Sequence, residues 1–299
     1  MPTSSRILIS GASGLIGTAL VPTLEARGFS ITRLLRRRRS GDNNVEWDPN
    51  NPLRPELLSG FDAVIHLAGE PVLGLWTNAK RARISNSRVL STRYLSEALA
   101  KTPQPPRVFI SGSATGYYGD RGDEVLREDS PSGEGFLPEV CRQWEGATKP
   151  AEDTRIRTVH IRTGIVLSAE GGALRAMLPS FKTGLGGKIG SGRQWMSWIH
   201  MQDQIGAMHH ILDHELVQGP VNLVTPSPVR NSEFTETLAK VLSRPAVFGV
   251  PAFALRIILG EMAKELLLAS QRVEPAKLIG SGYQFKYQDL PGALQNILG

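Results

Sequence analysis

A glycine-rich turn near the start of the chain is the first stretch whose residue types and spacing could do chemistry. Gly11, Gly14 and Gly17 form a GxxGxxG pattern directly after the apolar run of residues 7–9. Glycines at these places permit a tight turn, close approach of the backbone to a pyrophosphate, and close packing of a helix on a strand. The first amides of the following helix then face the anion. The pattern predicts a dinucleotide site contacted by Gly11, Ser13, Gly14, Leu15, Ile16 and Gly17.

Arginines follow the second predicted strand, where a carboxylate normally binds the ribose 2′-hydroxyl of NAD. Arg36 and Arg37 open a run of four arginines over residues 36–39. A guanidinium suits a 2′-phosphate through its charge and its forked hydrogen bonds. We therefore expect NADP(H) in preference to NAD(H), with Arg36 as the main contact. Four arginines cannot all reach one phosphate, so most of the run is expected to be a solvated loop.

Short apolar strands and helices must position these groups, and they alternate through the first half of the chain. This alternation is typical of a parallel sheet with helices on both faces. The expected strands are residues 7–9, 29–35, 63–67, 108–111 and 158–163, and the expected helices end near 27 or span 78–101 and 137–148. A loop is expected over residues 112–135.

Helices dominate after residue 163, where the alternation stops. The expected helices are 202–213, 232–242 and 253–269, with short strands at 221–224 and 246–250. The fold class predicted is α/β, a Rossmann-type doubly wound parallel sheet with a smaller C-terminal substrate lobe. The predicted boundaries are residues 1–165 for the dinucleotide-binding domain and 166–299 for a smaller mixed α/β lobe.

Composition excludes several classes of protein. Of 299 residues, 40% are hydrophobic and 21% are charged, as in an ordinary globular protein. No apolar stretch approaches the ~20 residues of a membrane span, and no secretory signal precedes residue 7. The net charge is +6, but no basic helical stripe accompanies it, so no nucleic-acid partner is expected. A single cysteine, Cys141, excludes an internal disulfide, so we expect a cytoplasmic protein, without a metal site.

Four motifs together resemble extended short-chain dehydrogenase/reductases. They are the glycine turn and residues 66–69, 111–119 and 198–200. More narrowly, the chain resembles the YfcH-type epimerase-family proteins, a branch also labelled SulA-like or cell-division-inhibitor-like. The narrower resemblance rests on residues 67–71, 111–119 and 184–192, and on the Arg244-Pro245 pair.

The resemblance implies roles for residues at the ends of several strands. Leu67, Ala68 and Gly69 would line the cofactor together with Ser111. Ser113 matches the residue that hydrogen-bonds the reacting oxygen in active members. The segment that would close over the nicotinamide end contributes Arg162, Thr163, Gly164 and Val166.

The sequence departs from the family at the Tyr-x-x-x-Lys pair, whose tyrosine is the acid/base. When Glu145 is matched to the glutamate that often follows this pair, Leu137 stands in the tyrosine position and Cys141 in the lysine position. The expectation is an NADP(H)-binding, epimerase/dehydratase/reductase-type oxidoreductase without the usual pair. The alternative is a weakly active or inactive NADP(H)-binding regulatory protein, linked to cell division.

Other side chains could move the proton instead. Tyr117 and Tyr118 are candidates, or else an aromatic pair that packs at the cleft edge. His200 either orients the substrate or hydrogen-bonds the backbone. Cys141 is either a reactive thiol or a small buried hydrophobe.

The substrate is expected to be a small molecule of unknown identity. Trp76, Arg81 and Arg88 could face its pocket. Residues 184–192, with Lys188 and the following Arg193, would form an anion-binding loop or a mobile lid. A homodimer through helices 78–101 and 137–148 is plausible for such a fold.

Overall fold

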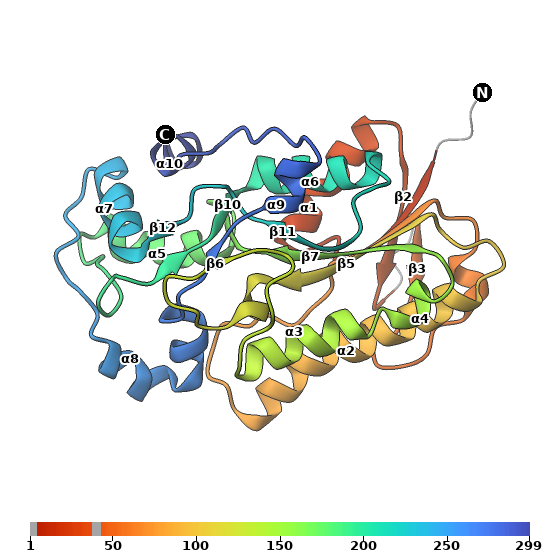
Figure 1. Cartoon of the computed structure of the whole chain (residues 1–299), viewed down its shortest axis with the longest axis horizontal. Coiled ribbons are helices and arrows are strands. Elements are labelled where there is room, and N and C mark those ends of the chain that lie inside the picture. The colour runs from red at the N-terminus through yellow and green to blue at the C-terminus, as the bar shows by residue number, and fades with distance from the viewer. Residues whose placement is uncertain (1–4, 38–42) are drawn as a thin grey trace.

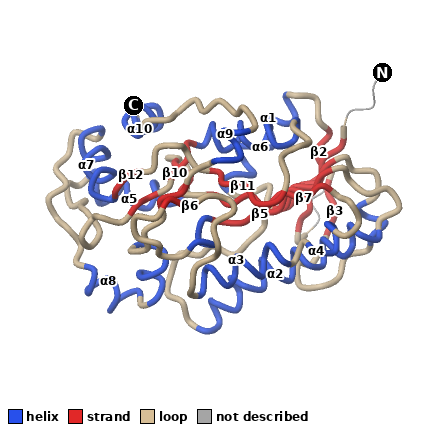
Figure 2. Tube along the Cα trace, viewed as in Figure 1, coloured by secondary structure: helices blue, strands red, loops and turns tan. Residues whose placement is uncertain are grey.

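A parallel sheet of seven strands forms the centre of the computed structural model, which describes residues 5–37 and 43–299 (Figure 2). The strand order is β11-β7-β5-β4-β1-β2-β3, and every neighbouring pair is parallel. The strands are β1 (Arg6–Ser10), β2 (Ser30–Leu35), β3 (Asn44–Glu46), β4 (Ala63–His66), β5 (Val108–Ala114), β7 (Arg157–Thr163) and β11 (Gly219–Leu223). The predicted fold class is confirmed.

Helices cover both faces of this sheet (Figure 1). Side chains alternate along a strand, so Ile7 and Ile9 pack on one face while Leu8 packs on the other. The first face carries α1 (Leu15–Ala26), α6 (Met201–Asp213) and α9 (Ala276–Gly280). The second face carries α2 (Asn78–Lys101), α3 (Phe136–Gly146) and α4 (Lys149–Glu152).

The second half of the chain adds a lobe beside the carboxyl edge of the sheet. Its helices are α5 (Gly172–Lys182), α7 (Asn231–Val241), α8 (Ala252–Leu259) and α10 (Leu290–Leu298). Two two-stranded pairs lie in this half: β8 (Ile165–Leu167) with β10 (Trp198–His200), and β9 (Trp195–Met196) with β12 (Val229–Arg230). A third pair, β6 (Val125–Leu126) with β13 (Arg272–Val273), links the lobe to the first half of the chain. The sheet takes β11 from this half, and the boundary after residue 165 stays a prediction.

Three expected elements differ from the structure. The strand over 246–250 is wrong: the segment is irregular and makes one bridge, from Val250 to Ile189. The expected helix 253–269 is interrupted at Gly260, whose φ of 58° ends α8 before the π-helix η3 (Ala263–Leu267). Within the expected loop 112–135, β5 continues to Ala114 and the 3₁₀-helix η2 (Thr115–Tyr118) follows. None of the helices in the described part of the chain is long and apolar enough to cross a membrane.

Candidate functional site

The glycine turn connects β1 to α1 and lies against the carboxyl end of β4. Gly11 has a φ of 72°, and a Cβ there would lie 2.6 Å from the carbonyl carbon of Leu67. A Cβ on Gly17 would lie 2.3 Å from the Gly11 carbonyl oxygen. Neither position accepts a side chain, so the sequence must use glycine for the strands and α1 to meet so closely. This is the point where the strand order reverses, which is where open α/β sheets bind ligands.

The first turn of α1 is open to an anion. Ser13 and Gly14 are exposed, and Leu15 and Ile16 are half-buried. The residue that caps α1 is Gly14, so no capping side chain accepts from the first amides of the helix. No acidic residue lies in the first turn either. The loop after β8 lies against Leu15, since a Cβ on Gly171 would stand 3.0 Å from its Cδ1. The backbone amides at the start of α1 and the loop after β8 therefore lie together at the carboxyl end of β1, where an anion could bind.

Arg36 and Arg37 are exposed directly after Leu35, the last residue of β2. Because β2 is the parallel neighbour of β1, its carboxyl end lies at the same edge of the sheet as the glycine turn. Arg36 and Arg37 therefore begin beside that turn. Arg38 and Arg39 lie outside the described residues. At the end of β4, on the other side of β1, Leu67 and Ala68 are half-buried and Gly69 is exposed.

A row of polar side chains crosses the sheet on the face that α2 and α3 cover. The register pairs Ser10 with His66, His66 with Ser111, and Ser111 with His160. His66 lies between Ser10 Oγ, at 2.5 Å, and Ser91 Oγ, at 3.2 Å. Burial lowers the pKa of His66 to about 4, with a contribution from the charge of Arg88. Ser111 is fully buried in this row, so its side chain lies between the sheet and the helices that cover it.

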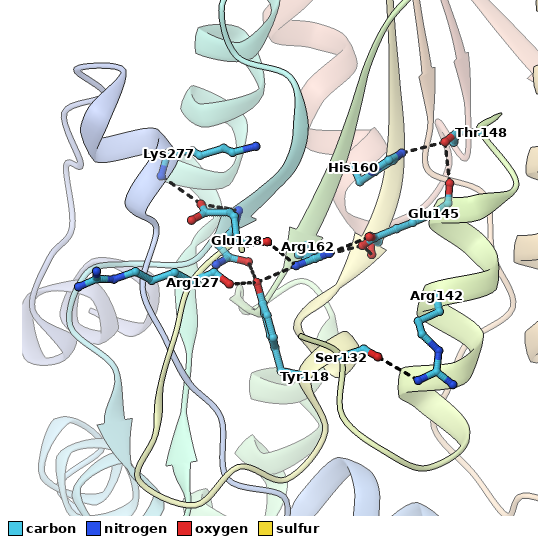
Figure 3. Close-up of polar contacts among 12 residues, drawn as sticks. Tyr118, Arg127, Glu128, Ser132, Arg142, Glu145, Thr148, His160, Arg162 and Lys277 are labelled. Atoms are coloured by element: carbon cyan, nitrogen blue, oxygen red, sulfur yellow. Dashed lines mark hydrogen bonds and ion pairs between the residues drawn. The ribbon is translucent and has the colours of Figure 1, made fainter. Parts of the chain in front are cut away.

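Two residues further along the strands, a second row contains Ser113, Arg162 and Asn222. Arg162 donates from Nε and Nη2 to the carboxylate of Glu145, each at 2.8 Å, as Figure 3 shows. Ser113 Oγ donates to Glu145 Oε1 at 2.6 Å. Arg162 was expected to close over a nicotinamide, but its side chain is buried and bonded to protein groups. This position favours a structural role for its guanidinium.

Tyr118 completes this buried network. Its hydroxyl accepts from Arg162 Nη1 at 3.0 Å and lies 2.7 Å from Asn222 Oδ1 (Figure 3). The side chain has no exposed surface, and burial raises the pKa of Tyr118 to about 12. Tyr117 is half-buried, with the Arg162 guanidinium 3.5 Å from its ring centroid. These positions favour the structural reading of the aromatic pair over proton transfer.

Leu137 and Cys141 lie on one face of α3, against η2. A Cβ on Gly116 would stand 3.5 Å from Leu137 Cβ and 3.9 Å from Cys141 Sγ. Both side chains are buried, and burial raises the pKa of the Cys141 thiol to about 12. The start of α3 is held from the second lobe, because Glu265 accepts from the amides of Phe136 and Leu137. The geometry favours Cys141 as a buried hydrophobe.

The other candidate residues lie at the carboxyl edge or in the second lobe. Thr163 ends β7, Gly164 follows it and Val166 lies in β8, and all three residues are half-buried. His200 is buried, its Nδ1 accepts from the amide of Gln202 at 3.0 Å, and its ring stacks on Tyr287. His200 therefore makes the backbone contact that was one of its two expected roles.

The residues that were expected near a substrate pocket contact other parts of the protein. The Trp76 ring packs edge-on against Phe136, at the start of α3. Arg81 forms an ion pair with Glu261, which connects the first lobe to the second. The loop 184–192 lies against residues 248–250, since a Cβ on Gly187 would overlap the Phe248 carbonyl. Sequence reasoning missed the bonds of Glu145 to Ser113 and Arg162. The available signal was the position of Glu145 on the same helical face as Cys141.

A glycine turn at the switch point, a serine at the end of β5 and a lobe over the carboxyl edge define an extended short-chain dehydrogenase/reductase. The chain belongs to the NAD dependent epimerase/dehydratase family, whose model matches residues 7–223. A second model, a domain of unknown function (DUF1731), matches residues 250–297.

The relatives reported below cover nearly the whole chain. The epimerase family protein Mb2239 of Mycobacterium bovis is 39% identical over 290 residues, 96% of each chain. The human epimerase family protein SDR39U1 is 36% identical, covering 98% of this chain and 99% of the relative. A crystal structure of that human protein (isoform 2) with NADPH matches with a TM-score of 0.89 and 35% identity, covering 98% of each chain.

Proposed function

We propose that this protein binds NADP(H) and is an epimerase/reductase-type oxidoreductase that acts on a small molecule. The observation that carries the proposal is the glycine turn between β1 and β4, with Arg36 and Arg37 exposed at the end of the adjacent β2. The structure of the human relative with NADPH supports the choice of cofactor.

Different residues at the carboxyl edge of the sheet would bind different parts of the dinucleotide. The first amides of α1 would hold the pyrophosphate, and Arg36 with Arg37 would hold the 2′-phosphate. Residues 67–69 would line the sugar, and Thr163, Gly164 and Val166 would flank the nicotinamide. The cofactor would supply hydride transfer, and the protein would supply position and proton handling.

Ser113 is the group best placed to handle a proton. Its hydroxyl donates to Glu145 at 2.6 Å, so its oxygen lone pairs are left to accept from a substrate hydroxyl. A proton taken at Ser113 Oγ could pass to the Glu145 carboxylate, which Arg162 holds in place. This pair would replace the function of the missing tyrosine.

A regulatory NADP(H)-binding protein is the second candidate, because Leu137 and Cys141 are buried where the family has its Tyr and Lys. Neither side chain can transfer a proton at neutral pH. The relatives named above are described as epimerase family proteins, and these descriptions do not support the cell-division label. Turnover of any alcohol or carbonyl substrate with NADP(H) would decide for the oxidoreductase.

The first experiment is calorimetric titration with NADPH, NADP, NADH and NAD. We expect tighter binding of the phosphorylated pair. Arg36→Ala should weaken NADPH binding by about 10- to 100-fold, the loss of hydrogen bonds to a charged group, and NADH binding by much less.

Arg107→Ala is the matched control, because Arg107 is 71% exposed and precedes β5 at the opposite edge of the sheet. This control should leave all four affinities unchanged. Equal losses for NADPH and NADH in Arg36→Ala would reject the 2′-phosphate assignment. No binding of any nucleotide by the wild type would reject the cofactor proposal itself.

A further inference from the structure

Helix α8 is apolar but contributes no buried side chain to the protein. None of its eight residues is buried, and Phe253, Ile257 and Ile258 are 68%, 79% and 65% exposed. The helix lies at the far end of the second lobe, away from the seven-stranded sheet (Figure 1). Apolar surface is favoured away from water, so a large exposed patch of it marks a site of contact with another protein or with a membrane.

The apolar surface continues beside α8. Val250, just before the helix, bridges to Ile189, so the loop 184–192 lies against this segment. In the described part of the chain, eleven large hydrophobic side chains are exposed, and seven of them lie here. These seven form what we call the apolar patch: Leu185, Val247, Phe248, Val250, Phe253, Ile257 and Ile258. Their concentration distinguishes the patch from single exposed hydrophobic residues, which are normal on a protein surface.

The two stretches that carry the patch are also strongly basic. No aspartate or glutamate lies within residues 171–202 or 237–260. Together they contain seven cationic side chains, all of them exposed: Arg175, Lys182, Lys188, Arg193, Lys240, Arg244 and Arg256. Because the net charge of the whole chain is +6, the remaining residues together carry −1. The positive charge of the protein is therefore concentrated in the stretches that carry the patch.

Three of these cations lie beside the patch without a carboxylate partner. Arg256 is on α8 itself, and Arg244 donates to the carbonyl of Lys182 at 3.1 Å. Among the residues that the structure describes, no carboxylate lies within ion-pair distance of these three side chains. Glu261, directly after α8, is paired with Arg81 instead. The patch therefore combines apolar side chains with positive charge that the protein does not neutralise.

We propose that the apolar patch docks on a membrane surface that contains anionic phospholipids. Phe253 and Ile257 insert among the lipid headgroups. Lys182, Arg244 and Arg256 contact the lipid phosphates. Apolar side chains beside lysines and arginines are the features with which a surface helix lies in the membrane interface. The sequence predicted no membrane partner because it has no spanning segment, and a peripheral contact does not need one.

A second copy of the chain is a poorer occupant for the patch. A two-fold contact places the same surface opposite itself, so the unpaired cations of one copy would face those of the other. Like charges across an interface oppose association. An anionic membrane supplies the opposite charge, and each basic residue near such a surface strengthens binding by about fivefold.

The first test is co-sedimentation of the full chain with lipid vesicles. One set contains phosphatidylglycerol and phosphatidylcholine in equal parts, and the other contains phosphatidylcholine alone. We expect binding to the anionic vesicles, and weaker binding when the NaCl concentration rises from about 0.05 M to about 0.5 M, because salt screens the charges. Binding to neither set, or equal binding to both sets, would overturn the proposal.

Paired variants separate the local charge from the net charge. Lys182→Gln with Arg256→Gln should weaken binding to the anionic vesicles by about 25-fold. Arg93→Gln with Arg107→Gln is the matched control, because it removes two charges from side chains that are 63% and 71% exposed elsewhere. The control should weaken binding by less than about twofold. Equal losses in the two double variants would mean that no particular surface docks.

A dye on α8 tests insertion. Because Cys141 is buried, Ile257→Cys supplies an accessible thiol for a nitrobenzoxadiazole label. Leu216→Cys is the matched control, since Leu216 is 95% exposed and lies between α6 and β11. Anionic vesicles should shift the emission to shorter wavelength at position 257 and leave it unchanged at position 216. Thermal unfolding checks that each variant is folded.

Three further outcomes would overturn the proposal. The first is a shift at both labelled positions, or at neither, with vesicles bound. The second is an equal shift at position 257 with poly-glutamate, which would assign the patch to an acidic polypeptide. The third is a protein that is dimeric without lipid and becomes monomeric in Ile257→Ser, which would assign the patch to a second copy.

Discussion

Burial decides what individual side chains can do in this protein. The residue types that attract attention in the sequence, a lone cysteine and a tyrosine pair, lie mainly inside the structure. Desolvation disfavours the charged form of a buried group, which raises the pKa of both Cys141 and Tyr118 to about 12. Ser113 is also buried, but its hydroxyl donates to the Glu145 carboxylate, which Arg162 holds in place.

Native Cys141 should resist alkylation. With a pKa of about 12, its thiolate fraction at pH 8 is on the order of 10⁻⁴, and the thiolate is the reactive form. Iodoacetamide at pH 8, followed by mass spectrometry, should modify the protein in urea and leave the folded protein unmodified over the same time. Rapid modification of the folded protein would restore the reactive-thiol interpretation of this residue.

At the scale of elements, α3 is held at both ends by hydrogen bonds to residues that are distant in the sequence. Glu265, from η3, accepts from the amides at its start. Glu145, near its end, accepts two hydrogen bonds from Arg162 on β7. The helix that carries the family's Tyr and Lys positions is thus fixed against the sheet and against the second lobe.

Breaking the pair between α3 and β7 should be costly. Arg162→Met leaves the Glu145 carboxylate, whose side chain is only 11% exposed, without its cation, and we expect a loss of about 3–5 kcal/mol in the free energy of unfolding. Urea denaturation measures this change. Arg142→Ala, on the exposed side of α3, is the control and should cost less than about 1 kcal/mol.

The double variant Arg162→Met with Glu145→Leu extends this test. Removing both charges should recover much of the stability lost in the single variant. If Arg162→Met unfolds at the wild-type urea concentration, the pair does not hold the helix.

At the scale of the whole molecule, the two halves of the chain share one sheet and several contacts. The second half supplies β11, and Ser270 donates from its amide to Asp120 at 3.0 Å. The substrate lobe is therefore expected to unfold together with the Rossmann half. The cytoplasmic location, the absence of a nucleic-acid partner, and a homodimer through α2 and α3 stay predictions.

Stability should fall as the pH falls from about 6.5 to about 4. Burial holds the pKa of His66 near 4, below the ordinary value of 6.5, so the unfolded chain takes up a proton there before the folded one. This group gives its full contribution above pH 6.5 and loses it towards pH 4, a change of about 3 kcal/mol.

Urea denaturation between pH 4.5 and 7 measures the slope of stability against pH. Burial also lowers the pKa of His200, His209 and His210, which adds a slope of the same sign. The variant His66→Gln should therefore keep a shallower slope than the wild type. An unchanged slope in this variant would mean that His66 titrates normally in the folded protein.

The sequence by itself determined the Rossmann-type fold class, the glycine turn and the position of Arg36 directly after the second strand. These features depend on local patterns: apolar strands of a few residues, glycines at fixed spacing, and a basic residue directly after a strand. The helix expected over 78–101 agrees with α2 because its polar start and its proline-rich end are local signals. The expected strand at 246–250 failed because strand formation needs a partner, and only Val250 finds one.

Only the tertiary structure decided which groups meet at the site. Ser113 and Glu145 are 32 residues apart, and Arg162 lies on a third element, so no local pattern connects them. The same holds for Arg88 and Gly69, which come together because α2 packs beside the end of β4. The physical reason is that hydrogen bonds and burial depend on distance in space, and the fold alone sets these distances.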